Sequence, residues 1–196
     1  MPKRPDKKEE RGFAAIIMAA GKGTRMKDPN GAKVMYKIHG KPMIRYVVDL
    51  AYNLGSSKVV VIVGYQREIV EAYVKQSHPD VECAFQEEQL GTGHAVMQAE
   101  KPLEKFSGDV LVLSGDVPFL NEATIEGLLR YRRRTHAVGT ILTAKLEDPT
   151  GYGRIIRNAD HSVKKIVEHE DATPEELEVR EINSGIYAFN KERLFF

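Results

Sequence analysis

Five β-branched residues follow one another at positions 59–63, and this run constrains the fold more than any other feature of the sequence. A strand that is apolar on both faces is typical of the centre of a parallel sheet, where helices cover both sides. Further short apolar runs occupy residues 13–18, 81–85 and 110–113. They alternate with segments of helical periodicity, so the first two thirds of the chain predict a βαβαβ layout of the nucleotide-binding type.

Helix-starting and helix-ending residues support this alternation. Pro42 is tolerated in the first turn of a helix that Gly55 ends, and Asn121 is a suitable N-cap for a later helix. Helices are expected near residues 43–50, 69–74, 93–100 and 125–129. The last third predicts strands at 138–144, 154–157, 163–167 and 186–189, with a short acidic helix at 174–177. We therefore predict an α/β fold with a Rossmann-like, mixed, mostly parallel sheet flanked by helices.

Composition excludes several classes of protein. The chain has 196 residues and a formal net charge of +1, which gives no bulk attraction to nucleic acid or to an anionic membrane. No apolar run approaches the roughly 18–20 residues of a membrane helix, so we expect a cytoplasmic protein. The single cysteine, Cys83, excludes an internal disulfide and is interpreted as a small core residue. Four arginines within residues 130–134 end a predicted helix and are interpreted as cations that face water.

The ends of the chain suggest its domain organisation. Residues 1–12 are polar and mixed in charge, which predicts a flexible tail in front of one domain over residues 13–196. Asn190 begins a capped helix that has scarcely started when the printed sequence stops at Phe196. An apolar, unfinished helix at a chain end is unusual, so we expect the domain to be truncated there.

A glycine-rich turn follows the first strand directly, with the sequence Ala-Ala-Gly-Lys-Gly-Thr-Arg-Met at residues 19–26. Small residues let the backbone approach a ligand, and successive N–H groups can bind phosphate oxygens. Lys22, Arg25 and, slightly later, Lys33 add cations that suit a polyphosphate. A plain strand-to-loop turn with solvated cations is the alternative. The spacing matches neither a Walker loop nor the dinucleotide fingerprint, which would need a glycine at Met26.

Six segments in register carry a family resemblance. Residues 19–26 resemble the signature of sugar-nucleotide pyrophosphorylases, and five further segments continue it in order: residues 86–95 (Gln-Glu-Glu-Gln-Leu-Gly-Thr-Gly-His-Ala), 115–118 (Gly-Asp-Val-Pro), 148–154 (Asp-Pro-Thr-Gly-Tyr-Gly-Arg), 166–169 (Ile-Val-Glu-His) and 181–185 (Glu-Ile-Asn-Ser-Gly). Together they resemble the uridylyltransferase domain of the bacterial bifunctional N-acetylglucosamine-1-phosphate uridylyltransferases/glucosamine-1-phosphate acetyltransferases. The resemblance runs from about residue 13 to the end.

The resemblance implies a magnesium-dependent transfer of UMP from UTP to N-acetylglucosamine 1-phosphate, which gives UDP-N-acetylglucosamine and pyrophosphate. Arg25 and Lys33 would be catalytic, and Asp116 would bind Mg²⁺. The residues implied in nucleotide binding are Ala19, Ala20, Gly21, Lys22, Gly23, Gln86, Gly91 and Thr92. Those implied in sugar binding are Gly153, Glu168 and Asn183.

Several of these residues can also be interpreted from their chemistry and position alone, without the resemblance. The Gln86 amide can both donate to and accept from a pyrimidine imide, although residues 91–92 could simply open the next helix. Asp116 follows an apolar strand, where α/β sheets bind ligands, although a lone Asp at a turn is often a cap. Glu168 and Asn183 could equally be a surface Glu and a turn Asn.

Two departures from the family pattern leave alternatives open. The family signature usually has a proline before the lysine, whereas this chain has Ala32, which predicts a less stiff loop. The second metal ligand of the family, an Asn, lies further downstream than residue 196, and the hexapeptide-repeat acetyltransferase domain has no counterpart here. We therefore expect no acetyl transfer and a monomer. The alternatives to the uridylyltransferase are a related enzyme for another sugar 1-phosphate and a nucleotide-binding fragment with little activity.

Overall fold

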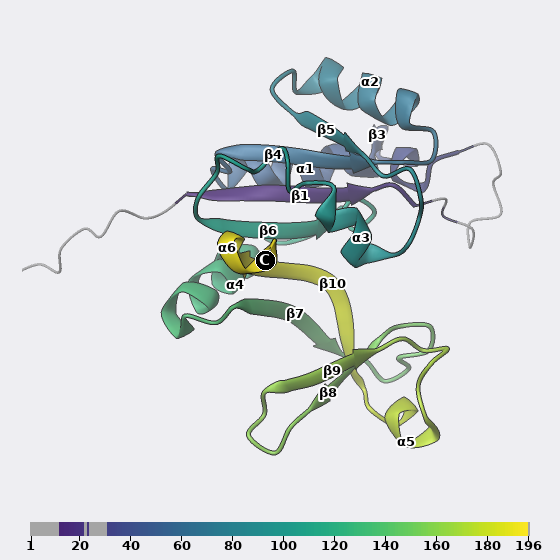
Figure 1. Cartoon of the computed structure of the whole chain (residues 1–196). Coiled ribbons are helices and arrows are strands. Elements are labelled where there is room, and N and C mark those ends of the chain that lie inside the picture. Colours follow the sequence, from purple (N-terminus) through teal and green to yellow (C-terminus); the bar gives the residue numbers. More distant parts are fainter. Residues whose placement is uncertain (1–11, 22, 24–30, 196) are drawn as a thin grey trace, which may run out of the picture.

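The computed structural model describes residues 12–21, 23 and 31–195. An eight-stranded sheet forms its centre, in the order β5-β4-β1-β6-β10-β8-β9, with β7 paired to β10. The first four strands in this order pair in parallel (Figure 1): β5 (Glu82–Phe85), β4 (Lys58–Val63), β1 (Phe13–Ala19) and β6 (Asp109–Ser114). The predicted tail, residues 1–12, lies outside the described residues except for Gly12.

The remaining strands join the sheet through β10 (Glu181–Asn190), which runs antiparallel to β6. The first part of β10 pairs with both β7 (Gly139–Lys145) and β8 (Arg154–Arg157), and its last part pairs with β6 and β7. A register shift between Asn183 and Tyr187 separates the two parts. β9 (Val163–Val167) pairs antiparallel with β8, and with α5 (Pro174–Leu177) these strands form a lower lobe (Figure 1).

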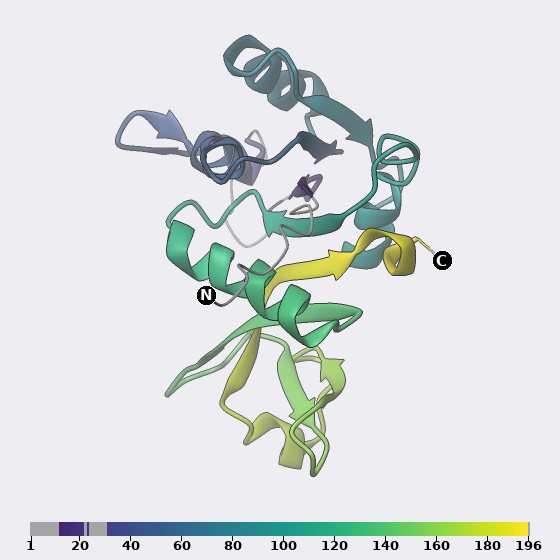
Figure 2. The same ribbon diagram turned by 90° about the vertical axis from the view of Figure 1, so that its left-hand side faces the viewer.

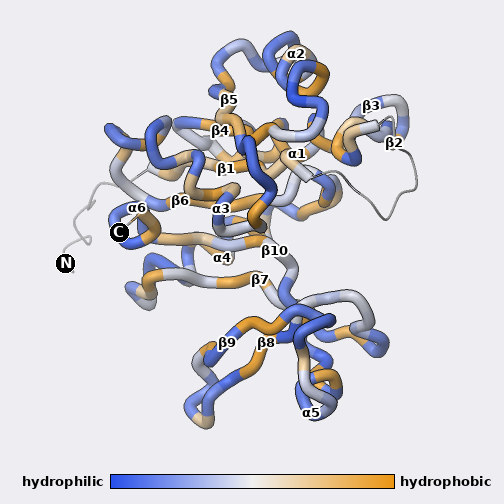
Figure 3. The backbone as a smooth tube through the Cα atoms, turned by 45° about the vertical axis from the view of Figure 1, so that its right-hand side comes forward, coloured by the Kyte–Doolittle hydropathy of each residue, from blue (hydrophilic) through white to orange (hydrophobic). Residues whose placement is uncertain are grey.

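Helices cover both faces of the sheet because alternate strand residues point to opposite sides. The helices α1 (Met43–Asn53), α2 (Arg67–Ser77) and α4 (Glu122–Thr135) pack on one face against a cluster that includes Ile17, Val61 and Leu113. On the other face, α3 (Thr92–Met97) and Leu194 of α6 (Lys191–Leu194) pack on a cluster that includes Ile16 and Val60. Figure 2 shows the two helical layers, and Figure 3 shows hydrophobic residues gathered along the inner strands.

The structure confirms the predicted α/β class and most of the predicted elements. Asn121 caps α4 by accepting a hydrogen bond from the Ala123 N–H, and Gly55 follows α1 with a positive φ of 79°. Cys83 packs against the core. The pKa of its thiol is raised to about 11, mainly by burial and to a smaller extent by the negative charge of Glu71. A thiol of this kind is a packing residue and a poor nucleophile.

Two local predictions differ from the structure, and two short elements were not predicted. Pro42 is the N-cap of α1, just before the first turn, because Lys41–Pro42 forms strand β3 and pairs with β2 (Lys37–Ile38). The short 3₁₀ helix η2 (Lys33–Met35), like this hairpin, had no clear signal in the sequence. β10 begins at Glu181, five residues before its predicted start at Ile186, because the strand continues through a bulge whose residues resemble a turn.

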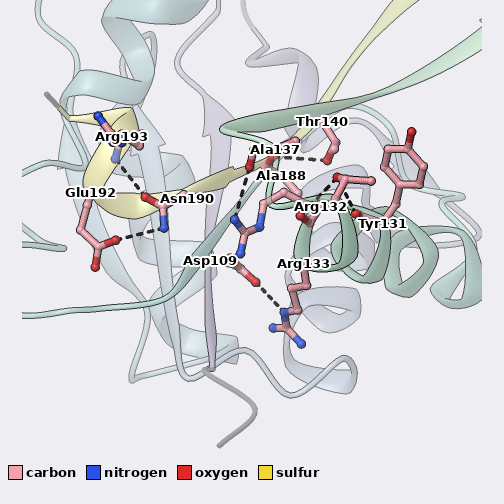
Figure 4. A network of polar contacts seen from close by, with 11 residues as sticks. Asp109, Tyr131, Arg132, Arg133, Ala137, Thr140, Ala188, Asn190, Glu192 and Arg193 are labelled. Atoms are coloured by element: carbon pink, nitrogen blue, oxygen red, sulfur yellow. Dashed lines mark hydrogen bonds and ion pairs between the residues drawn. The ribbon is translucent and has the colours of Figure 1, made fainter. Parts of the chain in front are cut away.

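The interpretation of the arginines in α4 as solvated cations is wrong for two of them. Arg132 and Arg133 both form ion pairs with Asp109, and the second pair joins Nε to Oδ2 at 2.5 Å. Asp109 begins β6 and is only 1% exposed, so it needs these partners (Figure 4). The network fixes the end of α4 to the edge of the sheet that lies opposite the carboxyl ends of its parallel strands.

Replacing Asp109 with Ala is expected to lower the free energy of unfolding by about 3 kcal/mol, because it leaves the partly buried Arg132 guanidinium without its charge partner. Urea unfolding followed by circular dichroism measures this loss. Glu126→Ala is the matched control on α4, since Glu126 is exposed and its Arg130 partner lies 3.9 Å away. An equal loss in the two variants would contradict a structural role for the buried carboxylate.

Candidate functional site

A cavity of about 480 Å³ opens at the carboxyl ends of β1 and β6. This is the edge of an α/β sheet where ligands usually bind. Nine of the fourteen residues implied in function line it: Ala19, Ala20, Gly21, Gly23, Lys33, Gln86, Gly91, Thr92 and Asp116. Of the remaining five, Lys22 and Arg25 lie outside the described residues, and the three residues implied in sugar binding form a separate cluster.

Gly23, in the described part of the glycine-rich turn, lies very close to Lys33. Gly23 has a φ of +62°, and a Cβ built on it would lie 2.7 Å from the Lys33 Cβ. Any larger residue at position 23 would therefore push Lys33 away while adopting a strained conformation. The turn and the lysine thus form one wall of the cavity together.

Two of the residues that line the cavity, Lys33 and Asp116, form an ion pair. Lys33 Nζ lies 2.6 Å from Asp116 Oδ2, and Ser114 Oγ donates a 2.7 Å hydrogen bond to Asp116 Oδ1. Partial burial raises the pKa of Asp116, but the hydrogen bonds from Lys33 and Ser114 together outweigh it and hold that pKa below its ordinary value. Asp116 is therefore ionised at neutral pH, beside a cation that can equally well face a phosphate.

The donor set suits a divalent metal ion that is held largely by a phosphate-bearing ligand. Asp116 is the one carboxylate among the described residues that line the cavity. No group of three His, Cys, Asp or Glu side chains able to hold a metal occurs in the described part of the chain. Mg²⁺ typically uses one or two carboxylates and completes its shell with phosphate oxygens and water. The cavity fits an ion of this type better than one held entirely by protein side chains.

Gln86, which also lines the cavity, is held in one orientation. Its side chain is 4% exposed, and its amide nitrogen lies 3.3 Å from the Gly91 carbonyl oxygen and 3.0 Å from His94 Nδ1. Gln98 in turn contacts the His94 ring and donates to the His94 carbonyl at 2.9 Å. A buried amide fixed by neighbours can discriminate between ring edges, because its donor and acceptor cannot exchange places freely.

Sequence reasoning missed two residues that line the cavity and make polar contacts. Gln89 Nε2 donates a 2.9 Å hydrogen bond to the Ala20 carbonyl oxygen, so it ties the segment after β5 to the glycine-rich turn. Ser114 fixes the Asp116 carboxylate, as described above. Gln89 belongs to segment 86–95 of the family resemblance, and Ser114 directly precedes segment 115–118. Their contacts could not be predicted from these segments alone, because they depend on the folded arrangement of the chain.

The structure brings Gly153, Glu168 and Asn183 together in the lower lobe. The Asn183 N–H donates to the Gly153 carbonyl oxygen at 2.9 Å, and a Cβ on Gly153 would lie 3.2 Å from Glu168 Oε1. Asn183 Oδ1 also accepts hydrogen bonds from the Tyr187 hydroxyl and the Gly185 N–H. Tyr187 pairs with Val112 of β6, so β10 connects this cluster to the strand that leads to Asp116.

Arg154 organises the loop in front of this cluster. Its side chain is among the largest that are fully buried, and it donates to the carbonyl oxygens of Pro149 and Tyr152. These bonds fold residues 149–153 around the guanidinium group. The backbone of Gly153 is thereby presented beside Glu168 without an intervening side chain.

Comparisons with known proteins find similar sequences over most of the chain. The model of the nucleotidyl transferase family matches residues 14–196. The bifunctional protein GlmU of Exiguobacterium sibiricum is 50% identical over 181 residues, which cover 92% of this chain and 39% of that protein. The bifunctional protein GlmU of Halalkalibacterium halodurans is 48% identical with the same coverage. The chain therefore spans about two fifths of the length of these relatives.

Solved structures show the same fold at low sequence identity. A UDP-glucose pyrophosphorylase complexed with UDP-glucose superposes with a TM-score of 0.75 at 18% identity, and the match covers 92% of this chain and 77% of that one. In the described part of the chain, no helix combines the length and the apolar content that a bilayer-spanning segment needs.

Proposed function

This chain belongs to the nucleotidyl transferase family, and from that premise we propose that it transfers UMP from UTP to N-acetylglucosamine 1-phosphate, with release of pyrophosphate. The observation that carries the proposal is the cavity in which Lys33, Asp116 and Gln86 meet the glycine-rich turn. The near-50% identity to bifunctional GlmU proteins over 92% of the chain supports the choice of base and sugar.

In the proposed reaction, the phosphate oxygen of the sugar 1-phosphate attacks the α-phosphorus of UTP, and the bond to pyrophosphate breaks. The attacking oxygen is already anionic, so no general base is required. Catalysis then consists of holding the two substrates in line and stabilising the charge on the transferring phosphoryl group. We assign the backbone of residues 19–23 and the cations Lys22 and Arg25 to the triphosphate, and Lys33 to the charge that develops in the transition state.

We further propose that Asp116 holds a magnesium ion together with substrate phosphate oxygens. The ion would supply charge neutralisation at the phosphates, while Lys33 moves from the carboxylate to the reacting phosphoryl group. We also propose that the chain acts as a monomer in the cytoplasm, with residues 13–196 forming its nucleotidyltransferase domain.

The experiment that tests the proposal measures pyrophosphate release from UTP and N-acetylglucosamine 1-phosphate, with Mg²⁺ and then with EDTA. Release that needs the metal and fails with ATP is the expected result. A panel with glucose 1-phosphate, CTP and dTTP separates the related enzymes. Binding of UTP without any release would replace the proposal with a nucleotide-binding role.

Gln86 provides a prediction about base recognition. Gln86→Leu is expected to raise the KM for UTP about tenfold, because a buried hydrogen bond to the uracil edge is lost. The preference for UTP over CTP should fall by a similar factor. Gln76→Leu is the control, since Gln76 lies exposed on α2 outside the cavity. An unchanged KM in a folded Gln86→Leu protein would rule out this role.

Gly153 provides a prediction about the sugar. In Gly153→Val, the new side chain meets the Glu168 carboxylate, so the KM for the sugar 1-phosphate should rise about tenfold while the KM for UTP stays the same. Gly127→Ala is the control, because nothing lies within 4 Å of a Cβ at that position in α4. A parallel rise of both KM values would show that the cluster does not recognise the sugar separately.

A further inference from the structure

Gln66 lies outside the residues that line the cavity, yet its side chain reaches the segment that carries Lys33. Gln66 Oε1 accepts a 2.8 Å hydrogen bond from the backbone N–H of Ala32, the residue directly before Lys33. We propose that this bond makes Gln66 a positioning residue, which holds Lys33 at the cavity by anchoring Ala32 to the turn between β4 and α2. The proposal rests on the catalytic role assigned to Lys33 above.

Without the Gln66 side chain, the buried Ala32 N–H would lose its hydrogen-bond acceptor. Ala32 is 1% exposed, so its amide has little access to water. Its φ of −63° and ψ of 125° place it before the 3₁₀ helix η2, where the Ala32 carbonyl accepts from Met35 N–H at 2.8 Å. A buried N–H without an acceptor is costly, so the segment would shift if the Gln66 amide were removed.

The acceptor itself is held in an unusual backbone conformation. Gln66 has a φ of 52° and a ψ of 39°, the left-handed region that residues other than glycine rarely adopt. It is the N-cap residue of α2, and the N–H groups of Ile69 and Val70 both donate to its carbonyl oxygen. The neighbouring Tyr65 N–H donates to Ala20 O at 3.1 Å, so the same turn also touches the glycine-rich segment. Strain of this kind persists where the surrounding contacts require it, and it often marks functional sites.

The consequence for Lys33 follows from the short path between the two residues. Lys33 is adjacent to the anchored amide, its Cβ faces Gly23, and its ammonium group faces Asp116. A shift of Ala32 therefore moves the lysine relative to both. We call the hydrogen bond from the Ala32 N–H to Gln66 Oε1 the latch. Because small displacements of a charged group in a catalytic site cost much of its effect, loss of the latch should lower kcat more than it raises KM.

A double-mutant cycle tests the latch. Gln66→Met keeps the length of the side chain but has no comparable acceptor, and Ala32→Pro removes the donor while matching the φ already present at that position. Gln66→Met should lower kcat about tenfold, with KM for UTP changed less than twofold. Ala32→Pro should stay within threefold of the parent, because proline, the residue that the family signature usually has there, stiffens the loop while it removes the donor. In the Ala32→Pro background, Gln66→Met should cost less than twofold, because no donor remains for the bond. Gln66→Glu keeps an acceptor and should stay within threefold of the parent.

Two results would overturn the proposal: kcat unchanged in Gln66→Met, or a tenfold fall in kcat when Gln66→Met is added to Ala32→Pro. Hydrogen exchange at the Ala32 amide tests the bond without any measurement of activity. We expect this amide to exchange at least tenfold faster in Gln66→Met than in the parent. An unchanged exchange rate would contradict the proposed bond. If the parent chain releases no pyrophosphate, the proposed function fails, and the exchange result alone decides whether the bond exists. Melting temperatures separate these effects from a general loss of folding.

Discussion

Asp116→Ala is expected to lower kcat for pyrophosphate release by about a thousandfold, or roughly 4 kcal/mol in activation free energy. The variant removes the one carboxylate among the described residues that line the cavity, and with it the proposed protein ligand of the metal. It also leaves Lys33 without its partner 2.6 Å away. Turnover at saturating substrates over a range of Mg²⁺ concentrations measures the loss, and added metal should not restore it.

The controls distinguish this effect from misfolding. Asp116→Asn keeps the size of the side chain and should lose nearly as much activity, because an amide is a far weaker ligand for a hard cation. Asp80→Asn changes an exposed carboxylate outside the cavity and should leave turnover unchanged. Stability should change by less than about 1 kcal/mol in either Asp116 variant, since the ion pair is partly exposed. Normal turnover in Asp116→Ala would refute the metal assignment.

The pH dependence of stability gives a further check on the same ion pair. Because the folded protein holds the pKa of Asp116 below its ordinary value, the carboxylate contributes stability above the unfolded pKa of about 3.9. That contribution should be constant from neutral pH down to about pH 5 and should shrink as the pH falls through the lowered value. The difference in unfolding free energy between the parent and Asp116→Asn should follow this course.

Lys33→Met has the second largest expected effect, a fall in kcat of about a hundredfold. Methionine keeps an unbranched side chain of similar length, so the change removes the cation while the packing beside Gly23 is preserved. Lys37→Met is the matched control, because Lys37 is exposed in β2 and does not line the cavity. Lys33→Arg should recover part of the rate, since it restores the charge with a different geometry. A similar loss in the two methionine variants would argue against a catalytic role for Lys33.

Much of the fold was predictable because its information is local. The five β-branched residues at 59–63 form the buried part of β4, and Asn121 is the N-cap that its side chain suggests. The site was predictable in outline for a different reason. Six short segments in fixed order resemble a known family, and parallel strands bring their carboxyl ends to one edge.

The parts that escaped prediction depend on contacts between distant segments. The sequence around Asp109 indicates only a polar residue at the start of a strand. Nothing near it in the sequence predicts its ion pairs with Arg132 and Arg133. The pairing of Lys33 with Asp116 joins residues 83 positions apart. Ala32 was expected to loosen its loop, whereas its N–H makes a hydrogen bond that a proline at the same position could not make. Pattern and periodicity carry no information about such pairs.

The position of β10 between β6 and the lower lobe has a consequence for how the chain is made. The part of β10 that pairs with β6 ends at Asn190, 76 residues after Ser114 (190 − 114). A ribosome adds about 5–20 residues each second, so this segment takes about 4–15 s to follow. During that interval the nascent chain presents β6 without the antiparallel neighbour that it has in the finished sheet. An unpaired edge strand invites pairing with other chains. Incomplete chains that end before β10 are therefore expected to pair with other chains more readily than the finished sheet does.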